Sequence, residues 1–428
     1  MLYPDMTFPR MIEVKQKFQL IRLEDYAEKI RMELRGANLK ERIRPGARIA
    51  ITAGSRGIAH YSEILRIVVE EVRKVGGEPF LVPAMGSHGG ATAEGQVALL
   101  RDLGITAESV GAPIVSSMDV EVIGKVGGGV PVYIDRNALK ADGIIVVARV
   151  KPHTDFKGRI ESGLMKMLAI GLGKQKGAET IHRFYREGYH KILPEAAKLV
   201  LRKAPVILGL AILENSCHEI AKIKAVEPEM FETEEERLLE EAKALMGRLP
   251  FKEIDVLIVD EIGKDVSGMG MDTNVTGRFW LPGESDPNAP MIRRIVVLGL
   301  TEKTHGNALG IGLADFTTET VFKKIDFQTT YINALTSGHP EVAKIPIFLP
   351  TERDAIAAAL HTCGPVDPKE AKVVRVRNTM ELERLWISES LLKIVESEPT
   401  LRDRIEVIGN LKEMHFDEFG MLKRLHNI

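Results

Sequence analysis

The chain has 428 residues, of which 44% are hydrophobic and 28% charged, and its formal net charge is −2. This composition is typical of a globular protein of two domains, and it lacks the basic blocks that bind nucleic-acid backbones. The two cysteines, Cys217 and Cys363, lie far apart, which argues against a disulfide scaffold and a structural zinc site. There is no signal peptide and no apolar run of about 18 residues, so we expect a cytoplasmic enzyme that has no membrane partner.

The first half of the chain predicts a parallel sheet covered by helices. Residues 1–45 are expected to form a cover with a charged helix near 24–34. Strands are expected near residues 12–14, 48–52, 79–83 and 143–150. Two of them run into glycine-rich loops that are followed by helices, a succession that favours an α/β fold. In such sheets ligands bind beyond the carboxyl ends of the strands.

A helix is expected after the strand at 143–150, and it carries an unusual lysine. Its apolar stripe is formed by Ile160, Leu164, Met167 and Leu168, at the spacing of one helix face. Lys166 lies off that stripe and is the only charged residue between Glu161 and Lys174. Its ammonium either extends to water or is held in a dry site, where its pKa would fall and the free amine would be a nucleophile.

The rest of the chain completes the first domain and, from about residue 251, predicts another α/β domain. Strands near 205–214 and 220–226 are expected to pair, and a capping box at Thr233–Glu236 is expected to open a helix. Further strands are expected near 255–260, 295–300 and 373–376, and further helices near 313–324 and 351–361. We therefore expect two α/β domains with largely parallel sheets, residues 1–250 and 251–428, with the active site in the crevice between them. The last thirty or so residues are expected to pack back on the first domain.

Three polar side chains follow predicted strands of the first domain, namely Arg56, His88 and His153. Since all three fall at strand ends, we expect them to face one crevice. The planar fork of Arg56 suits a carboxylate, and a histidine pKa near 6.5 suits acid–base chemistry at neutral pH. The alternatives are a surface arginine on a tight turn and two histidines bonded to loop backbone.

With Lys166 and His182, these residues make an ordered set that resembles the nickel-dependent lactate racemase family. The family's markers run in the order of Arg56, His88, His153, Lys166 and His182, at similar spacings. The resemblance implies a cofactor, a nickel-pincer nucleotide derived from nicotinic acid mononucleotide, tethered through Lys166, with Ser55 and Gly57 beside it. His182 would bind the nickel, although a histidine on a helix surface would also fit its position.

The resemblance implies a racemase or epimerase that inverts C2 of a 2-hydroxy acid. Hydride would pass reversibly to the pyridinium ring of the cofactor, Arg56 would hold the carboxylate, and His88 or His153 would take the hydroxyl proton. Separate cofactor-making enzymes would be transient partners, and protein made in a foreign host can lack the cofactor. No nucleic-acid partner is expected.

The chain also departs from the family pattern. Ala53 stands where the family has an aspartate, and the stretch between the second histidine and the lysine is about three residues longer. The family's substrate residues in the second domain are replaced by a glycine-rich segment with long polar side chains. Substrate-binding roles are expected there for Lys264, Asp272, Asn274 and Arg278. Because buried polar groups need partners, we expect a larger polar 2-hydroxy acid in place of lactate.

Two other functions fit parts of the sequence. The segment from Thr52 to Ile58 resembles the glycine-rich turn of short-chain dehydrogenases, which would make the protein a nicotinamide-dependent dehydrogenase. Those enzymes need a tyrosine four residues before a lysine, and none of the seven tyrosines here has one. The other alternative is a non-catalytic protein that binds a small anion and leaves Lys166 unmodified.

Overall fold

The computed structural model describes residues 3–423 and divides into two compact units. The N-terminal unit runs from Leu20 to Met246. The C-terminal unit starts at Gly247 and also includes the N-terminal stretch up to Gln19. Both units combine helices with a largely parallel sheet, so the α/β class expected from the sequence is confirmed.

The N-terminal unit is built on a five-stranded sheet in the order β3-β2-β6-β7-β8. Its strands are β2 (Arg48–Ala53), β3 (Glu78–Pro83), β6 (Gly143–Arg149), β7 (Val206–Glu214) and β8 (Ile220–Val226). The first four strands of this order are parallel, and β8 pairs antiparallel with β7. A separate hairpin is formed by β4 (Val120–Val126) and β5 (Val130–Asp135). The carboxyl ends of four strands therefore share one edge.

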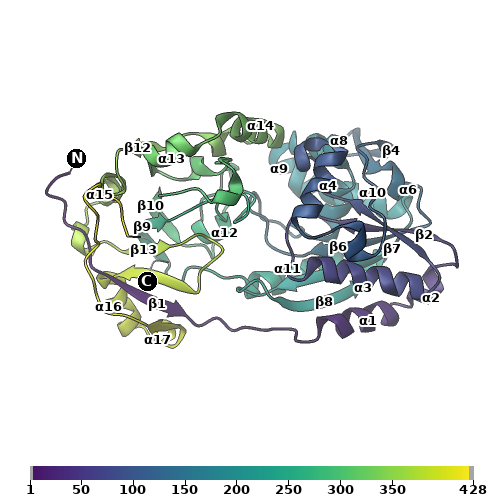
Figure 1. The fold of residues 1–428 in the computed structure, drawn as a ribbon, viewed down its shortest axis with the longest axis horizontal. Coiled ribbons are helices and arrows are strands. Elements are labelled where there is room, and N and C mark those ends of the chain that lie inside the picture. The colour runs from purple at the N-terminus through teal and green to yellow at the C-terminus, as the bar shows by residue number, and fades with distance from the viewer. Residues whose placement is uncertain (1–2, 424–428) are drawn as a thin grey trace. The chain divides into compact units, whose positions relative to one another are not determined.

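Helices cover both faces of this sheet (Figure 1). They are α1 (Tyr26–Gly36), α3 (Tyr61–Lys74), α4 (Ala93–Asp102), α8 (Lys174–His182), α10 (Leu193–Lys203) and α11 (Phe231–Leu245). Because side chains alternate along a strand, Ile49 and Ile51 of β2 pack with α1 and α3, whereas Ala50 packs with α10 and α11 on the other face. Both faces are buried, which explains the continuous apolar runs in the sequence.

The helix expected from Ile160 onward begins later and is irregular. A helical turn, α7 (Leu164–Lys166), leads into a π-helix, η2 (Met167–Gly171), and then into α8. The chain cannot be helical before Gly163, because the backbones of Lys151 and Ser162 exchange hydrogen bonds of 3.0 and 3.2 Å. A π-helix is rare and is frequently found at functional sites. Here it packs so closely that a Cβ on Gly171 would lie 2.7 Å from the carbonyl oxygen of Ala84.

The C-terminal unit has an eight-stranded sheet in the order β12-β11-β10-β9-β13-β14-β1-β15. Its strands are β1 (Met11–Gln16), β9 (Glu253–Val259), β10 (Met291–Val297), β11 (Phe316–Thr318), β12 (Ile347–Leu349), β13 (Val373–Val376), β14 (Arg384–Ser388) and β15 (Ile405–Val407). The five strands from β12 to β13 are parallel, and the last three run antiparallel to their neighbours. The main helices are α13 (Glu319–Lys324), α14 (Phe327–Ser337), α15 (Glu352–Thr362), α16 (Glu389–Ser397) and α17 (Pro399–Arg404).

The N-terminal strand differs from the sequence expectation. Residues 1–45 are expected to cover the first domain, but β1 belongs to the C-terminal sheet, where Met11 pairs with Ser388. The pairing covers the edge of β14, which would otherwise expose unpaired backbone groups. The described part of the last thirty residues includes β15, which pairs with β1 in this same unit. The functional roles assigned to the two domains remain predictions.

The expected capping box at Thr233 is wrong. Helix α11 begins two residues earlier, at Phe231, and the Thr233 hydroxyl donates to the Met230 carbonyl instead. The two cysteines, Cys217 and Cys363, are not joined in a disulfide. In the described residues, every helix is too short or too polar to cross a membrane.

Candidate functional site

The candidate residues Arg56, His88 and His153 follow three parallel strands at the carboxyl edge of the N-terminal sheet. Strands β2, β3 and β6 end at Ala53, Pro83 and Arg149. The loops after β2 and β3 are bound together where the Ala84 N–H donates to the Ala53 carbonyl at 2.8 Å.

His153 and Lys166 form a direct pair in this site. Lys166 Nζ is in hydrogen-bond contact with His153 Nε2. The other ring nitrogen, Nδ1, accepts from the backbone N–H of Asp155 at 3.0 Å. His153 is buried and its ring packs on Phe156 and Tyr189. Lys166 is half-buried, so it neither reaches fully into water nor packs in the apolar core.

The surroundings favour the uncharged form of both groups of this pair. Burial lowers the pKa of Lys166 to about 8, an effect that Asp155 opposes and Arg56 reinforces. Burial and the neighbouring Lys166 hold the pKa of His153 well below its usual value of 6.5. Lys166 is therefore held against His153 and does not extend freely into water.

A buried glutamate that the sequence analysis passed over holds the loop of His153. Glu161 has no exposed surface and accepts the backbone N–H groups of His153 at 2.7 Å and Gly158 at 3.2 Å. Its charge is compensated by Lys157 at 3.4 Å and by Lys243 at 3.3 Å. The loop that carries His153 and Asp155 is therefore fixed by hydrogen bonds to a single carboxylate.

A second buried glutamate holds the helical turn of Lys166. Glu235 of α11 accepts the backbone N–H of Met165 at 2.8 Å, at the first turn of α7. Burial raises the pKa of Glu235 to about 7. A Cβ on Gly163 would lie 2.5 Å from this carboxyl group, so Gly163 is needed for the close approach. Glu235 lies seventy residues from Met165 in sequence, so no local pattern could have indicated this contact.

Arg56 lies in a group of charges at the same edge. Burial lowers the pKa of its guanidinium, and so does the nearby Arg149, whereas Asp155 acts in the opposite direction. Arg149 forms an ion pair with Glu214 at the end of β7. Glu214 also accepts the Ala59 N–H at 2.7 Å. The edge thus concentrates positive charge, which suits an anionic ligand.

The loop after β2 does not have the geometry of a dinucleotide-binding turn. Such a turn opens directly into a helix, but α3 begins only at Tyr61, after His60 in a left-handed conformation with φ of 56°. The Gly54 N–H donates to the Tyr61 hydroxyl at 2.6 Å. Ser55 Oγ bonds His88 Nδ1 at 2.6 Å, and Gly57 is exposed. Ser55 therefore orients a candidate base, while the cofactor-binding roles of Ser55 and Gly57 remain predictions.

Gln96 and Lys174 hold the loop of His88 in place through hydrogen bonds. The Gln96 side-chain amide donates to the carbonyls of Gly86 at 2.9 Å and His88 at 3.3 Å. Lys174 Nζ donates to Gln96 Oε1 at 3.2 Å and to the Pro83 carbonyl. The same network therefore fixes His88 and the start of α8, the helix that ends at His182.

His182 belongs to an aromatic cluster that includes His153. The centroid of the Tyr189 ring lies 5.6 Å from the His182 ring and 6.0 Å from the His153 ring. Phe156 stacks on Tyr189 at 4.4 Å. Among residues 3–423 no group of three or more His, Cys, Asp or Glu side chains could hold a metal by itself. A metal bound through His182 would therefore need most of its ligands from a bound molecule.

The four polar residues expected to bind substrate from the second domain are engaged within the C-terminal unit. Lys264 donates to the Gly268 carbonyl at 2.9 Å. Asp272 caps a short helix, α12 (Thr273–Thr276), and accepts from the Asn274 side chain at 2.7 Å. Arg278 forms an ion pair with Asp315 at 2.7 Å. These contacts give each side chain a structural role, and their substrate-binding role stays a prediction.

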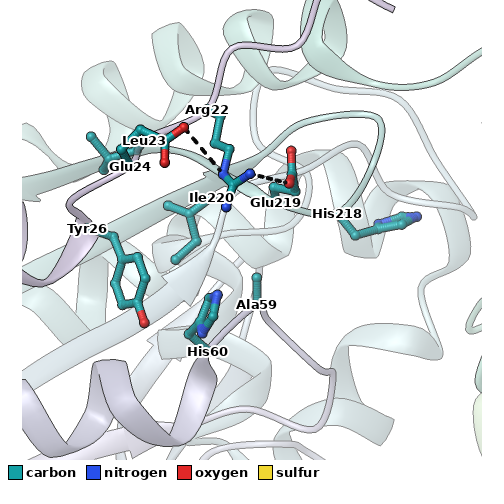
Figure 2. Close-up of a pocket in the computed structure, with 9 residues that line it drawn as sticks. All are labelled: Arg22, Leu23, Glu24, Tyr26, Ala59, His60, His218, Glu219 and Ile220. Atoms are coloured by element: carbon teal, nitrogen blue, oxygen red, sulfur yellow. Dashed lines mark ion pairs between the residues drawn. The ribbon is translucent and has the colours of Figure 1, made fainter.

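A small cavity of about 110 Å³ lies elsewhere on the N-terminal unit (Figure 2). Arg22 lines it and is paired with Glu219 at 3.3 Å and with Glu24 at 3.7 Å. His60 and His218 also line it, and both have positive φ. The cavity is not lined by His88, His153, Lys166 or His182. The charge of Arg22 is already offset by two carboxylates, so the described residues that line this cavity offer no free cation to an anionic ligand. We therefore place the candidate site at His153 and Lys166.

The fold and this edge define an α/β protein with a lysine–histidine pair at the carboxyl ends of parallel strands. Residues 6–190 match the family model of the lactate racemase N-terminal domain. This match supports the resemblance to the lactate racemase family that the sequence indicated, over the N-terminal part of the chain.

A comparison of folds covers more of the chain. The structure of the lactate racemase apoprotein from Thermoanaerobacterium thermosaccharolyticum is similar with a TM-score of 0.53 at 13% sequence identity, over 87% of this chain and 99% of that one. At this identity the similarity concerns the fold. No curated protein matches the chain.

Proposed function

We propose that the protein is a racemase or epimerase that inverts C2 of a 2-hydroxy acid with a nickel-pincer nucleotide tethered to Lys166. The observation that carries the proposal is the Lys166–His153 pair, which lies at the strand edge inside the region that matches the racemase family. The family match itself supports the coarser statement, that the chain is of the racemase type.

The side chains present fit such a cofactor. Lys166 has the lowered pKa that an amine needs to form a covalent bond at neutral pH. His182 shares the aromatic cluster of His153, and imidazole is a suitable nickel ligand. When bound, the cofactor would take a hydride from the substrate carbon and return it to either face.

The remaining steps fall to the protein's own residues. Arg56 would bind the substrate carboxylate through its planar guanidinium. His88, oriented by Ser55, would accept the hydroxyl proton of one enantiomer, and His153 would accept that of the other. The buried ring cluster of Phe156 and Tyr189 would keep water from the reacting carbon.

The choice of substrate is the least constrained part of the proposal. The expectation of a larger polar acid rests on unsatisfied polar groups in the segment from Lys264 to Arg278. In the structure those groups have partners within the protein, so they do not call for a larger polar substrate. We retain a 2-hydroxy acid as the substrate class. Lactate, malate and aldonic acids should be tested side by side by chiral chromatography.

The proposal is tested by making the chain together with cofactor-producing enzymes and measuring its intact mass, nickel content and racemase activity. We expect a covalent mass increment that Lys166→Ala abolishes and that the exposed Lys176→Ala retains. If the increment persists in Lys166→Ala, the tether lies elsewhere. Activity that depends on a nicotinamide removable by dialysis would favour the dehydrogenase, and binding without turnover would favour an anion-binding protein.

A further inference from the structure

The hydrogen bonds of His153 indicate which atoms of the Lys166–His153 pair carry protons. His153 Nδ1 accepts the Asp155 backbone N–H at 3.0 Å, so Nδ1 carries a lone pair. A neutral imidazole with a lone pair on Nδ1 must carry its proton on Nε2. Nε2 is the atom that contacts Lys166 Nζ, so the lysine must be the acceptor. An amine accepts a hydrogen bond only in its neutral form, because an ammonium has no lone pair.

The opposite arrangement is unfavourable. If Lys166 were an ammonium donating to Nε2, the histidine proton would have to be on Nδ1. Nδ1–H and the Asp155 N–H would then be two donors facing each other at 3.0 Å in a buried site. Two unsatisfied buried donors are costly. The Asp155 N–H cannot turn away, since Glu161 holds the loop at His153 and at Gly158.

From this geometry we infer that His153 is a positioning residue for Lys166: its Nε2–H tautomer raises the share of the lysine that is a free amine before any cofactor is attached. The inference rests on the proposed function, because it assigns His153 a role in preparing the tether. This role belongs to the protein before the tether forms; to act afterwards as a base on the substrate, His153 would first have to give up its Nε2 proton. It also explains why the loop after His153 is fixed so firmly by Glu161.

Several neighbouring charges shift the pKa values of Lys166 and His153. They are Asp155, Arg56, Lys151 and Lys157. Arg56 and Lys151 favour the neutral amine of Lys166, and Lys157 favours the neutral ring of His153, whereas Asp155 favours the charged form of both. The Asp155 residue therefore acts in two opposite ways, since its backbone N–H locks the histidine tautomer and its carboxylate stabilises positive charge on Lys166.

The test measures the reactivity of Lys166 in protein made without cofactor-producing enzymes. Acetic anhydride labelling across a pH series, followed by peptide mass spectrometry, gives the half-labelling pH of each lysine. The exposed Lys176 is the internal reference. Lys166 is expected to show its midpoint near pH 8. A midpoint for Lys166 equal to that of Lys176 would overturn the inference.

Two variants separate the inference from a general loosening of the site. In His153→Gln the amide can turn its oxygen toward an ammonium, so the Lys166 midpoint should rise by about one pH unit, which is a tenfold loss of free amine near pH 8. In Asp155→Asn the backbone N–H remains but the negative charge is lost, so the midpoint should fall. Shifts in opposite directions cannot come from loosening, and an unchanged midpoint in His153→Gln would contradict the inference.

A second measurement reads the tautomer of His153 directly in the parent protein. The ¹⁵N chemical shifts of its labelled histidines report which ring nitrogen carries the proton. We expect the Nε2–H tautomer for His153, identified by the signal that is lost in His153→Gln, and an Nδ1–H tautomer would overturn the inference. If Lys166 titrates like Lys176 yet still acquires the covalent mass increment, the inference fails while the proposed function stands. If Lys166 has a low half-labelling pH but never acquires the covalent mass increment, the inference stands while the proposed function fails.

Discussion

Lys174 Nζ lies 3.2 Å from Asp135 Oδ2, and neither side chain has any exposed surface. Asp135 ends the strand β5, and it also accepts the Ala138 N–H at 2.9 Å. Through Gln96 and the Pro83 carbonyl, the same ammonium reaches the loop of His88. This buried ion pair therefore links the helix that ends at His182 to the loop of a candidate base.

We predict that Lys174 is structural. Lys174→Met would leave Asp135 buried without its counter-charge, which typically costs about 3–5 kcal/mol. The free energy of unfolding from urea titration measures the loss. Lys176→Met, two residues along the same helix and exposed, should change it by less than about 0.5 kcal/mol. Equal stability of the two variants would show that the buried pair contributes nothing.

We also predict that Glu235 makes stability depend on pH. Its folded-state pKa of about 7 lies above the ordinary value of 4.5, so the folded protein holds the proton more tightly than the unfolded chain. The contribution of Glu235 to stability is then greatest below about pH 4.5 and is lost as the pH rises through 7. The change corresponds to roughly 3 kcal/mol as an upper order of magnitude.

Glu235→Gln removes this titration while retaining an oxygen that can accept the Met165 N–H. The difference in unfolding free energy between pH 5 and pH 8.5 should be smaller in this variant than in the parent. The exposed Glu240→Gln, on the same helix, should keep the parent's difference. A Glu235→Gln variant with the parent's pH dependence would show that another group is responsible.

His182 is predicted to bind nickel. His182→Ala protein made with the cofactor-producing enzymes should keep the organic mass increment on Lys166 and lose most of its nickel, because tether and metal ligand are separate bonds. The exposed His190→Ala, next to Tyr189 in the same cluster, is the matched control and should keep its nickel. The nickel content of both variants is measured by metal analysis. Equal nickel content in the two variants would exclude His182 as a nickel ligand.

The two candidate bases are predicted to affect the rate strongly. His88→Gln and His153→Gln should each lower turnover of the loaded enzyme about a hundredfold or more, through loss of a proton acceptor. His361→Gln, on α15 of the C-terminal unit, is the control and should leave turnover unchanged. In heavy water the substrate carbon should not gain deuterium. Rapid deuterium uptake at that carbon would indicate an enolate mechanism and contradict the hydride proposal.

The sequence by itself determined the α/β class and the order of the candidate residues. Apolar runs at Arg48–Ala53, Glu78–Pro83 and Gly143–Arg149 predict buried strands because a doubly covered sheet needs apolar residues on both faces. Strand ends in a parallel sheet share one edge, so Arg56, His88 and His153 could be placed there from local pattern. These properties depend on residues close together in the chain.

Only the tertiary structure decided the features that rest on distant pairs. Lys166 contacts His153, and the helical turn of Lys166 is held by Glu235, which lies seventy residues from Met165. β1 joins the C-terminal sheet through Ser388, more than three hundred residues away. The burial that shifts the pKa of a lysine or a glutamate depends on every element packed around it. Such burial and pairing across long separations leave no periodic signal in the sequence, so they could be known only from the folded chain.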